Sequence, residues 1–509
     1  MPAPLAAAVL VAYGLVLAVL FVHGLSFLRL TWIAVRDRRR RPSASTADRW
    51  PSVTVQLPIF NERYVAERLI DAVARFEYPG ALEIQVLDDS TDDTIAIAAA
   101  IVRGWRERGV DAVHLRRTER LGFKAGALAE GLAVARGERI AIFDADFIPR
   151  PDFLLRMVPI LESDPGLAFV QARWDHANPD ASLLTRLQAL AIDGHFAVEQ
   201  HGRWSGGDWF NFNGTAGVWR RAAIVDAGGW RSTTLTEDLD LSYRAFLRGW
   251  RAAYQRDVGV EAELPVGLRA YRRQQARWAR GSLECAWLHL PSLLRAPVSR
   301  PRRLWAALHL TGYSIHLLLL ALSALYPLLL IILATDRGAA DLVGLLGVMG
   351  LPALAPSILF AVGQGLLGRP HRALLLIVPL SLLGVGMMVN TARAALAAAC
   401  RRSAHFERTP KYGAGARGGT WRRLGYQIRG DWGVAAEAGL AMLNLATCAA
   451  ALAGAQWAIA FFAGLFGTGL AFVAALSIAE AARGVWDRRA APRTALTAGP
   501  VLDDAALGR

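Results

Sequence analysis

The chain has 509 residues, 54% of them apolar, and a mean hydropathy of +0.28. This length and apolarity predict more than one domain with part of the chain in lipid, which excludes a wholly soluble protein. The formal net charge is +14, but the basic residues cluster beside apolar runs, which favours the positive-inside rule over a nucleic-acid surface. We therefore expect no nucleic-acid partner. The three cysteines match no metal-ligand spacing, and no disulfide framework is predicted.

The first apolar stretch, residues 5–28, is long enough to cross a bilayer and has no basic residue before it. A cleaved signal peptide would have a positive flank and a shorter apolar core. We therefore interpret residues 1–35 as a retained transmembrane anchor with its amino terminus outside, followed by a basic linker over residues 36–48. The next segment is then expected to be cytosolic.

Residues 49–270 differ in character from the anchor, because short β-rich runs alternate there with helical segments. The β-rich runs are residues 53–57, 83–87, 140–143 and 168–172. Such alternation predicts an α/β domain with a mostly parallel sheet flanked by helices. The domain would lie in the cytosol, inserted between transmembrane helices of a polytopic membrane protein.

The rest of the chain is predicted to lie at or in the membrane. Residues 271–304 are expected to form interfacial amphipathic helices, and residues 305–487 a transmembrane region with candidate segments at 305–333, 342–366, 373–398, 434–452 and 457–478. The loops 369–372 and 400–432 are basic, so both are expected to face the cytosol. The segment between them then fits a re-entrant or interfacial segment, and we predict five crossings with six as the alternative. Residues 488–509 are predicted to be a disordered tail.

Two carboxylates, Asp144 and Asp146, follow the apolar run 140–143. A carboxylate pair at the end of a buried strand is suited to holding a divalent cation against a diphosphate, because hard cations take oxygen ligands and a strand end fixes them rigidly. This pair predicts a nucleotide-sugar enzyme that uses a divalent cation.

Other polar residues lie at the predicted strand ends and turns. Asn61 and Glu62 follow the first strand, where open α/β sheets place ligands, although helix capping explains them equally well. Asp89 ends the second strand and could accept hydrogen bonds from a base or ribose. Lys124 lies between two glycines and offers a point charge for phosphate, the alternative being a solvated surface lysine.

Three later motifs complete the candidate site. Residues 210–217 alternate aromatic and amide side chains, which could line a sugar groove or simply end a strand. Glu237 and Asp238 open an amphipathic helix, where acids either favour the helix amino terminus or supply a general base for a sugar hydroxyl. Gln274, Arg277 and Trp278 fall at i, i+3 and i+4 of a helix, so an amide, a cation and a flat ring share one face.

Asp89, the Asp144–Asp146 pair, residues 236–238 and residues 274–278 together resemble the D, DxD, TED and QxxRW signature of membrane-embedded family 2 glycosyltransferases, the cellulose and hyaluronan synthase group. A closer likeness is to plant cellulose synthase-like A and C proteins, the mannan/glucomannan and xyloglucan-backbone synthases. It rests on residues 86–92, 123–128, 170–174 and 212–217 and covers roughly residues 53–281. The resemblance implies a GT-A fold for the α/β domain.

The resemblance also implies roles for individual residues. Asp144 and Asp146 would hold Mg or Mn, and Asp238 would be the catalytic base, with Glu237 as the next candidate. Nucleotide-sugar binding would fall to Asn61, Glu62, Asp89, Lys124, Asp144, Gln274 and Arg277, and acceptor binding to Trp278, Phe212, Asn213, Gly214 and Thr215. Phe406, Thr409 and Lys411 match the FxVTxK gating loop of that group, although Arg408 replaces valine and Pro410 intrudes. An ordinary basic linker is the alternative for this loop.

These parts predict a processive, inverting synthase that makes a β-linked polysaccharide, a β-1,4-mannan/glucomannan or β-glucan, from GDP-mannose or UDP-glucose and exports it. Its partners would be the nucleotide sugar, a β-glycan acceptor and the lipid bilayer, and it would lie in the plasma (inner) membrane with its catalytic domain in the cytosol. One alternative is a glycosyltransferase that adds one or a few sugars to a membrane lipid. Another is a sugar-binding transporter or receptor. Donor identity and oligomeric state stay open.

Overall fold

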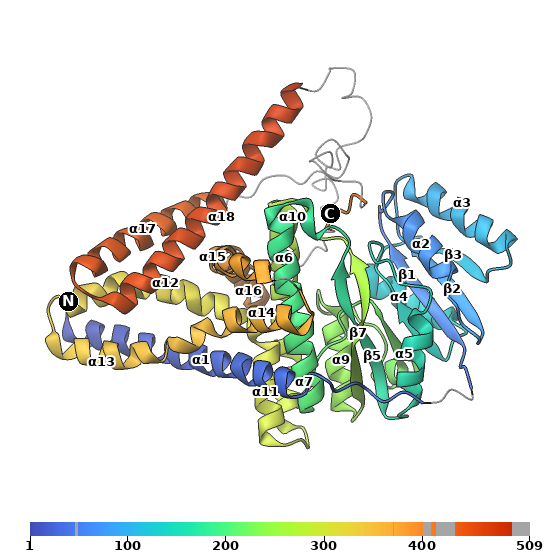
Figure 1. Cartoon of the computed structure of the whole chain (residues 1–509), viewed down its shortest axis with the longest axis horizontal. Helices are drawn as coiled ribbons and strands as arrows, with labels where there is room; N and C mark the ends of the chain where they lie inside the picture. The colour runs from blue at the N-terminus through green and yellow to red at the C-terminus, as the bar shows by residue number, and fades with distance from the viewer. Residues whose placement is uncertain (46–48, 370, 401–408, 414–432, 491–509) are drawn as a thin grey trace.

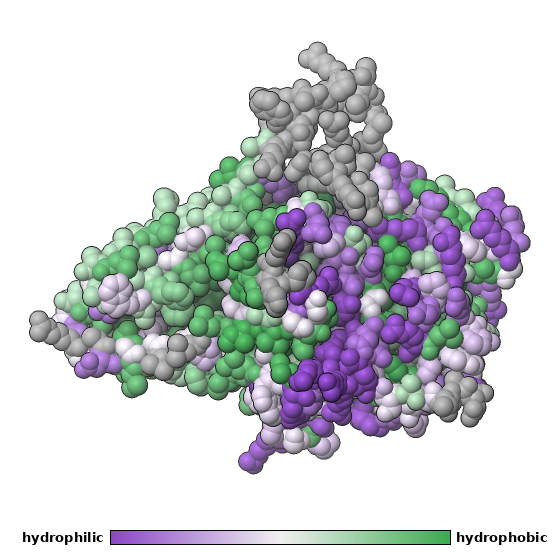
Figure 2. Space-filling view, in the orientation of Figure 1, coloured by the Kyte–Doolittle hydropathy of each residue, from purple (hydrophilic) through white to green (hydrophobic). Residues whose placement is uncertain are grey.

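The computed structural model describes residues 1–45, 49–369, 371–400, 409–413 and 433–490. Apolar helices gather at one end of the molecule and a helix-flanked sheet at the other, with α10 and α6 between them (Figure 1). The same division appears on the surface in Figure 2, where hydrophobic residues cover the helical end and hydrophilic residues cover much of the sheet end. The molecule is therefore built from a membrane-type half and a water-exposed half.

A seven-stranded sheet forms the centre of the α/β domain, with the strand order β3-β2-β1-β4-β6-β5-β7. All neighbours pair in parallel except β6, which runs antiparallel to both β4 and β5. The expected mostly parallel sheet is thus confirmed. The strands are β1 Val53–Ile59, β2 Leu82–Asp88, β3 Ala112–Arg116, β4 Arg139–Ile142, β5 Leu167–His176, β6 Gly217–Arg220 and β7 Arg251–Ala262.

Helices cover both faces of this sheet. Two hydrophobic cores result, one around Val55, Phe143 and Met157 and the other around Phe169 and Trp219. These side chains are no more than 1% exposed, as expected for a sheet buried on both faces. The covering helices are α2 Ala66–Ala74, α3 Thr94–Glu107, α4 Phe123–Val134, α5 Phe153–Glu162, α6 Leu183–Gly194, α7 His201–Gly206, α8 Arg221–Asp226 and α9 Glu237–Leu247.

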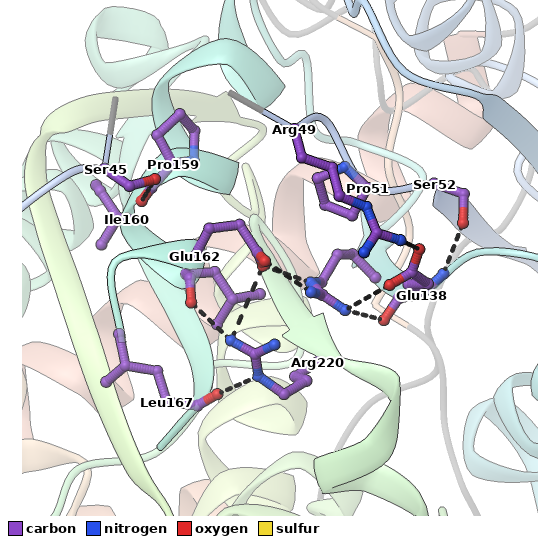
Figure 3. A network of polar contacts seen from close by, with 12 residues as sticks. Ser45, Arg49, Pro51, Ser52, Glu138, Pro159, Ile160, Glu162, Leu167 and Arg220 are labelled. Carbon is purple, nitrogen blue, oxygen red and sulfur yellow. Dashed lines mark hydrogen bonds and ion pairs between the residues drawn. The ribbon is translucent and has the colours of Figure 1, made fainter. Parts of the chain in front are cut away.

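The connection from the first helix to β1 is fastened to the sheet edge where β1, β4 and β5 begin. Figure 3 shows this polar network. The Arg49 guanidinium lies 2.9 Å from the Glu138 carboxylate, and the Ser45 amide donates to the Pro159 carbonyl at 3.0 Å. The Arg139 guanidinium, at the first residue of β4, pairs with the Glu162 carboxylate at 2.6 Å. These contacts leave the opposite, carboxyl-terminal ends of the strands available for a site.

Five helical segments among the described residues are long and apolar enough to cross a membrane. They are Ala3–Arg36, Gly312–Leu333, Asp341–Leu366, Gly433–Ala453 and Trp457–Ala482. The expected segment beginning at residue 305 starts later, because the chain breaks at Gly312–Ser314, between α11 Arg300–Leu310 and α12 Ile315–Leu333. The other membrane elements are α1 Ala3–Arg36, α13 Arg337–Val348, α14 Ala355–Leu366, α15 Ile377–Gly386, α16 Met388–Ala399, α17 Gly433–Ala453 and α18 Trp457–Ala490.

The segment expected to be re-entrant is a bent helix pair. Leu374–Gly386 and Met388–Ala399 meet at 41°, so they form either one broken span or a re-entrant loop. On one side of this pair, the Arg369 guanidinium lies 2.8 Å from the Asp175 carboxylate of the α/β domain. On the other side, the Lys411 ammonium lies 2.7 Å from the Asp146 carboxylate of the same domain. Both flanks of the bent pair therefore touch the same domain.

The long helix α10 Leu268–Arg295 joins the two halves. Its first backbone amide, that of Leu268, donates to the Glu480 carboxylate of α18 at 2.7 Å. Arg272 of α10 forms a buried ion pair with Glu437 of α17 and donates to the Ser477 hydroxyl of α18 at 3.0 Å. The helix that was expected to carry part of the site is thus held by the last two membrane helices.

Candidate active site

A cleft lies at the carboxyl-terminal ends of the parallel strands, where open α/β sheets bind ligands. Residues from the ends of β1, β2, β4, β5 and β7 line it together with residues of α9, α10 and the segment 409–413. The predicted site residues on its wall are Glu62, Asp89, Lys124, Asp144, Asp146, Asn213, Gly214, Glu237, Asp238, Gln274, Arg277, Trp278, Thr409 and Lys411. Motifs spread over some 350 residues of sequence thus meet in one cleft.

Asp144 follows β4 and points its carboxylate at a lysine. The Lys124 ammonium lies 2.6 Å from Asp144 and 3.4 Å from Glu237, and it donates to the Gly214 carbonyl at 2.9 Å. Burial alone would lower the pKa of Lys124, but the Asp144 and Glu237 charges outweigh it and raise that pKa. Lys124 is therefore a fixed cation between two carboxylates and not a solvated surface residue.

Asp146 belongs to a second, more buried polar cluster. Its side chain is 10% exposed, and one carboxylate oxygen accepts both the Lys411 ammonium at 2.7 Å and the Glu263 amide at 3.1 Å. Glu263 follows β7, and its carboxylate pairs with the Arg68 guanidinium at 3.2 Å. The two carboxylates of the Asp144–Asp146 pair thus face two different lysines.

Asp89, at the end of β2, is held by a two-pronged arginine contact. The Arg117 guanidinium donates to its two oxygens at 2.8 and 2.5 Å. Nearby, Asn61 follows β1 with a positive φ of 54°, and its side-chain oxygen accepts the Thr91 amide at 2.8 Å. Asn61 therefore ties the ends of β1 and β2 together and does not cap α2, which begins at Ala66 with Val65 as its first flanking residue.

Glu237 and Asp238 form the first turn of α9, beside the glycine turn at Gly214. Burial, and then repulsion from Glu237, raise the pKa of Asp238 from 3.8 to about 7. The Ser242 hydroxyl donates to the Asp238 carbonyl at 2.6 Å, which fixes this turn of the helix. A carboxylate with a pKa near neutrality in a cleft is suited to accept a proton from a hydroxyl.

Gln274, Arg277 and Trp278 share one face of α10, as predicted, and this face lines the cleft. The Trp278 ring lies 6.3 Å from the Trp174 ring, centroid to centroid, at 53°. Close packing holds α10 beside α9, because a Cβ on Gly281 would meet the Thr236 backbone nitrogen at 2.9 Å. The Leu235 amide also donates to the Glu284 carboxylate of α10 at 3.0 Å. The acidic turn and the aromatic face are therefore fixed relative to each other.

Two residues predicted to bind the acceptor lie elsewhere. Phe212 is fully buried in the second core against Phe169 and Trp219, so its ring cannot line a groove. Thr215 is also fully buried, and its hydroxyl accepts the Asp144 amide at 2.9 Å, which makes it a support for the carboxylate. The alternation over residues 210–217 therefore places aromatic rings in the core and small polar groups at the cleft. Phe406 lies outside the described residues.

Several residues on the cleft wall were not among the predicted site residues. Trp174, Asp175 and His176 come from the end of β5, and Glu263 comes from the end of β7. The His176 ring nitrogen Nε2 lies 3.0 Å from the Asp193 carboxylate of α6, and Gln364 of α14 donates to the same carboxylate at 2.9 Å. An acidic or aromatic residue at a strand end is the signal that could have found them.

The carboxylates of the cleft suit a hard divalent cation that is held partly by the protein and partly by a substrate. No group of three or more His, Cys, Asp or Glu side chains able to hold a metal occurs in the part of the chain that the structure describes. Mg²⁺ is usually held by one or two carboxylates together with substrate phosphates, so the Asp144–Asp146 pair matches that mode. It does not match an all-protein metal cage.

Comparison with known proteins identifies the domain. Residues 51–281 match the family described as glycosyltransferase like family 2. Over this segment the chain is similar to family 2 glycosyltransferases. The matched segment contains the sheet, the acidic turn of α9 and the Gln274–Arg277–Trp278 face.

Curated relatives align with the same glycosyltransferase domain. Glucomannan 4-beta-mannosyltransferase 2 of Arabidopsis thaliana is 48% identical over 237 residues, covering 46% of this chain and 44% of that protein. Glucomannan 4-beta-mannosyltransferase 1 of Oryza sativa subsp. japonica is 44% identical over 265 residues, covering 51% and 50%. The chain thus matches about half the length of these relatives.

A solved structure shows the same fold. A mannosyltransferase from Pyrobaculum calidifontis, in complex with GDP-Man and Mn²⁺, superposes with a TM-score of 0.50 at 23% identity. The superposition covers 77% of this chain and 100% of the other chain. This match confirms the predicted GT-A fold of the domain.

Proposed function

We propose that this protein is a processive, inverting glycosyltransferase that makes a β-linked polysaccharide, a β-1,4-mannan/glucomannan or a β-glucan, from a nucleotide sugar. The observation that carries this proposal is that one cleft combines three parts: a carboxylate pair, an acid with a pKa near 7, and a tryptophan face on a helix bound to membrane helices. The names of the aligned plant relatives, glucomannan 4-beta-mannosyltransferases, support a β-mannosyl product.

The donor would lie across the strand ends. Asp89 and the turn at Asn61 and Glu62 would form the nucleotide end of the cleft, and Lys124, Gln274 and Arg277 would face the diphosphate. Asp144 and Asp146 would hold Mg or Mn, which when bound offsets charge on the departing nucleoside diphosphate. The names of the plant relatives, mannosyltransferases, support a mannosyl donor such as GDP-mannose, and UDP-glucose is the alternative.

The transfer step needs a base and an aligned acceptor. The Asp238 carboxylate would take the proton of the acceptor hydroxyl while its oxygen attacks the anomeric carbon in line. The bond between that carbon and the diphosphate oxygen breaks, and the nucleoside diphosphate leaves with the electron pair. In-line attack inverts the anomeric configuration, so an α-linked donor gives a β-linked product.

The acceptor end would stack on Trp278, with Asn213 and Gly214 on the neighbouring wall. Because α10 connects this face to α17 and α18, the product would be positioned for exit through the membrane half. Thr409 and Lys411, the described residues of the gating-loop motif, line the cleft, which supports a loop that responds to the bound donor. The domain would face the cytosol, in the plasma (inner) membrane.

The decisive experiment is size analysis of radiolabelled product made by the purified protein from GDP-mannose and from UDP-glucose, with Mn²⁺ or with excess EDTA. We expect a polymer, and no transfer in EDTA. A single-sugar product extractable into chloroform would instead show a lipid glycosyltransferase. Binding of the donor without its hydrolysis or transfer would show a transporter or receptor.

Trp278 tests whether the product is held as a chain. Trp278→Ala removes stacking worth about 0.5 to 1.5 kcal/mol beyond burial, so early release should shorten the polymer at equal donor turnover. Donor binding should change little, because the indole lies on the acceptor side. An unchanged length distribution would remove Trp278 from the acceptor site.

A further inference from the structure

The chain has only two lysines among its 57 basic residues, Lys124 and Lys411. Both ammonium groups lie on the carboxylate pair, Lys124 at 2.6 Å from Asp144 and Lys411 at 2.7 Å from Asp146. All the other basic residues in this count are arginines. An ammonium is a compact point charge, whereas a guanidinium is a broad planar fork. Lysine is therefore present at the two places where a compact cation fits against a catalytic carboxylate.

The Lys411 ammonium group has the kind of oxygen neighbours that a small cation would have. Its ammonium contacts two oxygen atoms, the Asp146 carboxylate at 2.7 Å and the Glu263 carbonyl at 2.5 Å. A carboxylate and a backbone carbonyl are oxygen ligands of the kind that hard divalent cations take. Asp146 cannot offer the same oxygen to the ammonium and to a divalent cation, because the two charges would repel at contact distance.

The contact is made by a short stretch that docks as a unit. Thr409, Lys411 and Tyr412 are all buried, and the Tyr412 amide donates to the Glu263 carboxylate at 2.7 Å. The charged groups that face Lys411 are Asp146 and Glu263, and Arg68 pairs with the Glu263 carboxylate from the other side. If Lys411 leaves, Glu263 keeps Arg68 as a partner, whereas the Asp146 carboxylate loses its ion-pair partner.

We propose that Lys411 and a divalent cation compete for the Asp146 carboxylate, so that metal entry into the cleft releases residues 409–413. Lys411 is thus an internal substitute for the metal, and Glu263 is the residue that holds its segment in place. This inference rests on the proposed metal role of Asp146. In the metal-free state each carboxylate of the Asp144–Asp146 pair then has a lysine partner, and metal loading is linked to opening of the 409–413 contact.

The first test is Mn²⁺ binding to the full chain in detergent, with the metal alone, followed through the electron paramagnetic resonance signal of free Mn²⁺. Lys411→Met should bind Mn²⁺ about 10- to 100-fold more tightly than the wild type, since it removes a competing hydrogen bond between charged groups. Arg49→Met, which removes an exposed cation at the far edge of the sheet, should bind as the wild type does. Adding Asp146→Asn to Lys411→Met should abolish the gain.

The second test uses the two native lysines as reporters in the wild type. Acetylation of lysine amines, measured by mass spectrometry, should become several-fold faster at Lys411 when Mn²⁺ is added. Lys124 keeps Glu237 and the Gly214 carbonyl as partners when metal binds Asp144, so its acetylation should change less than that of Lys411. Sodium chloride of equal ionic strength is the control for screening.

Equal or weaker Mn²⁺ binding by Lys411→Met, including no binding by either protein, would overturn the inference. Unchanged Lys411 acetylation at saturating Mn²⁺ would overturn it as well. The proposed function fails on a different result, sugar transfer that persists in excess EDTA, so the two failures can be told apart.

Discussion

Asp238 is the residue whose chemistry depends most on its surroundings. Its carboxyl group lies at the start of α9, close to Glu237 and within the field of Lys124. Burial and the Glu237 charge favour the protonated form, while Lys124 opposes them. The balance places the pKa at about 7. A group that merely stabilised the amino terminus of a helix would gain nothing from such a shift.

Asp238→Asn is expected to bind the donor nearly normally and to lose turnover by a factor on the order of 10² to 10⁴, the usual contribution of a positioned general base. A base must be unprotonated, so wild-type turnover should rise with pH and level off above about 7. Steady-state kinetics between pH 5 and 9 would show both effects. Near-normal turnover by the variant would move the role of base to Glu237.

The same shift has a consequence for stability. Because the folded-state pKa lies above 3.8, the stabilising contribution of this carboxyl group is present below pH 3.8 and is lost as pH rises to about 7. Asn carries no charge at any of these pH values. The Asp238→Asn protein should therefore melt at the same or a higher temperature than the wild type at pH 8, which separates loss of the base from loss of the fold.

At the scale of elements, α10 connects the chemistry to the membrane half. Its Arg272 side chain is 5% exposed and that of its partner Glu437 in α17 is fully buried. The Asn390 side chain of α16 donates to the Arg272 carbonyl at 3.0 Å. Three membrane helices thus fix the start of the helix that carries Trp278.

Glu437→Ala should lower the free energy of unfolding by about 3 to 5 kcal/mol, because it leaves the Arg272 charge buried without its carboxylate. Glu138→Ala is the matched control, since it breaks the Arg49–Glu138 pair, in which the side chains are 80% and 44% exposed. That change should cost less than about 1 kcal/mol. Thermal melting in detergent would compare the two, and equal melting temperatures would show that α10 does not depend on α17.

The sequence predicted some elements well and missed others for physical reasons. The first, second, fourth and fifth strands are apolar runs with clear periodicity. β6 has only four residues and follows a glycine turn, and β7 contains Ala252, Ala253, Asp257 and Gly259, which have low strand propensity. Its place beside β5 comes from tertiary pairing, which local pattern does not contain.

For the site too, features of the local sequence could be predicted, whereas tertiary contacts could not. Carboxylates directly after strands, such as Asp89 and Asp144, could be predicted from their position along the chain. Contacts between distant segments could not: Arg117 on Asp89, and Lys411 on Asp146 across 265 positions of sequence. Phe212 was misplaced because the alternation of aromatic and amide residues does not say which set faces the core.

For the whole molecule, the contacts on both sides of the bent pair favour five membrane crossings over six. α12 leaves the side of the glycosyltransferase domain, and the following span, Asp341–Leu366, returns to it, since Arg369 reaches Asp175. After the bent pair the chain is again on that side, because Lys411 reaches Asp146. A segment that begins and ends on one side is re-entrant, so we predict five crossings.

Cys400, which is exposed at the end of α16, reports this arrangement. In a Cys448→Ala background, where Cys285 stays buried, a membrane-impermeant maleimide should label Cys400 only from the side of the glycosyltransferase domain. Glu107→Cys, on the surface of that domain, should label from the same side. Thr335→Cys, between α12 and α13, should label from the other side once Cys400 is replaced by Ala. Sealed vesicles of both orientations provide the measurement. If Cys400 labelled together with Thr335→Cys, the bent pair would be a sixth crossing, and the contact of Lys411 with Asp146 could not form in the membrane.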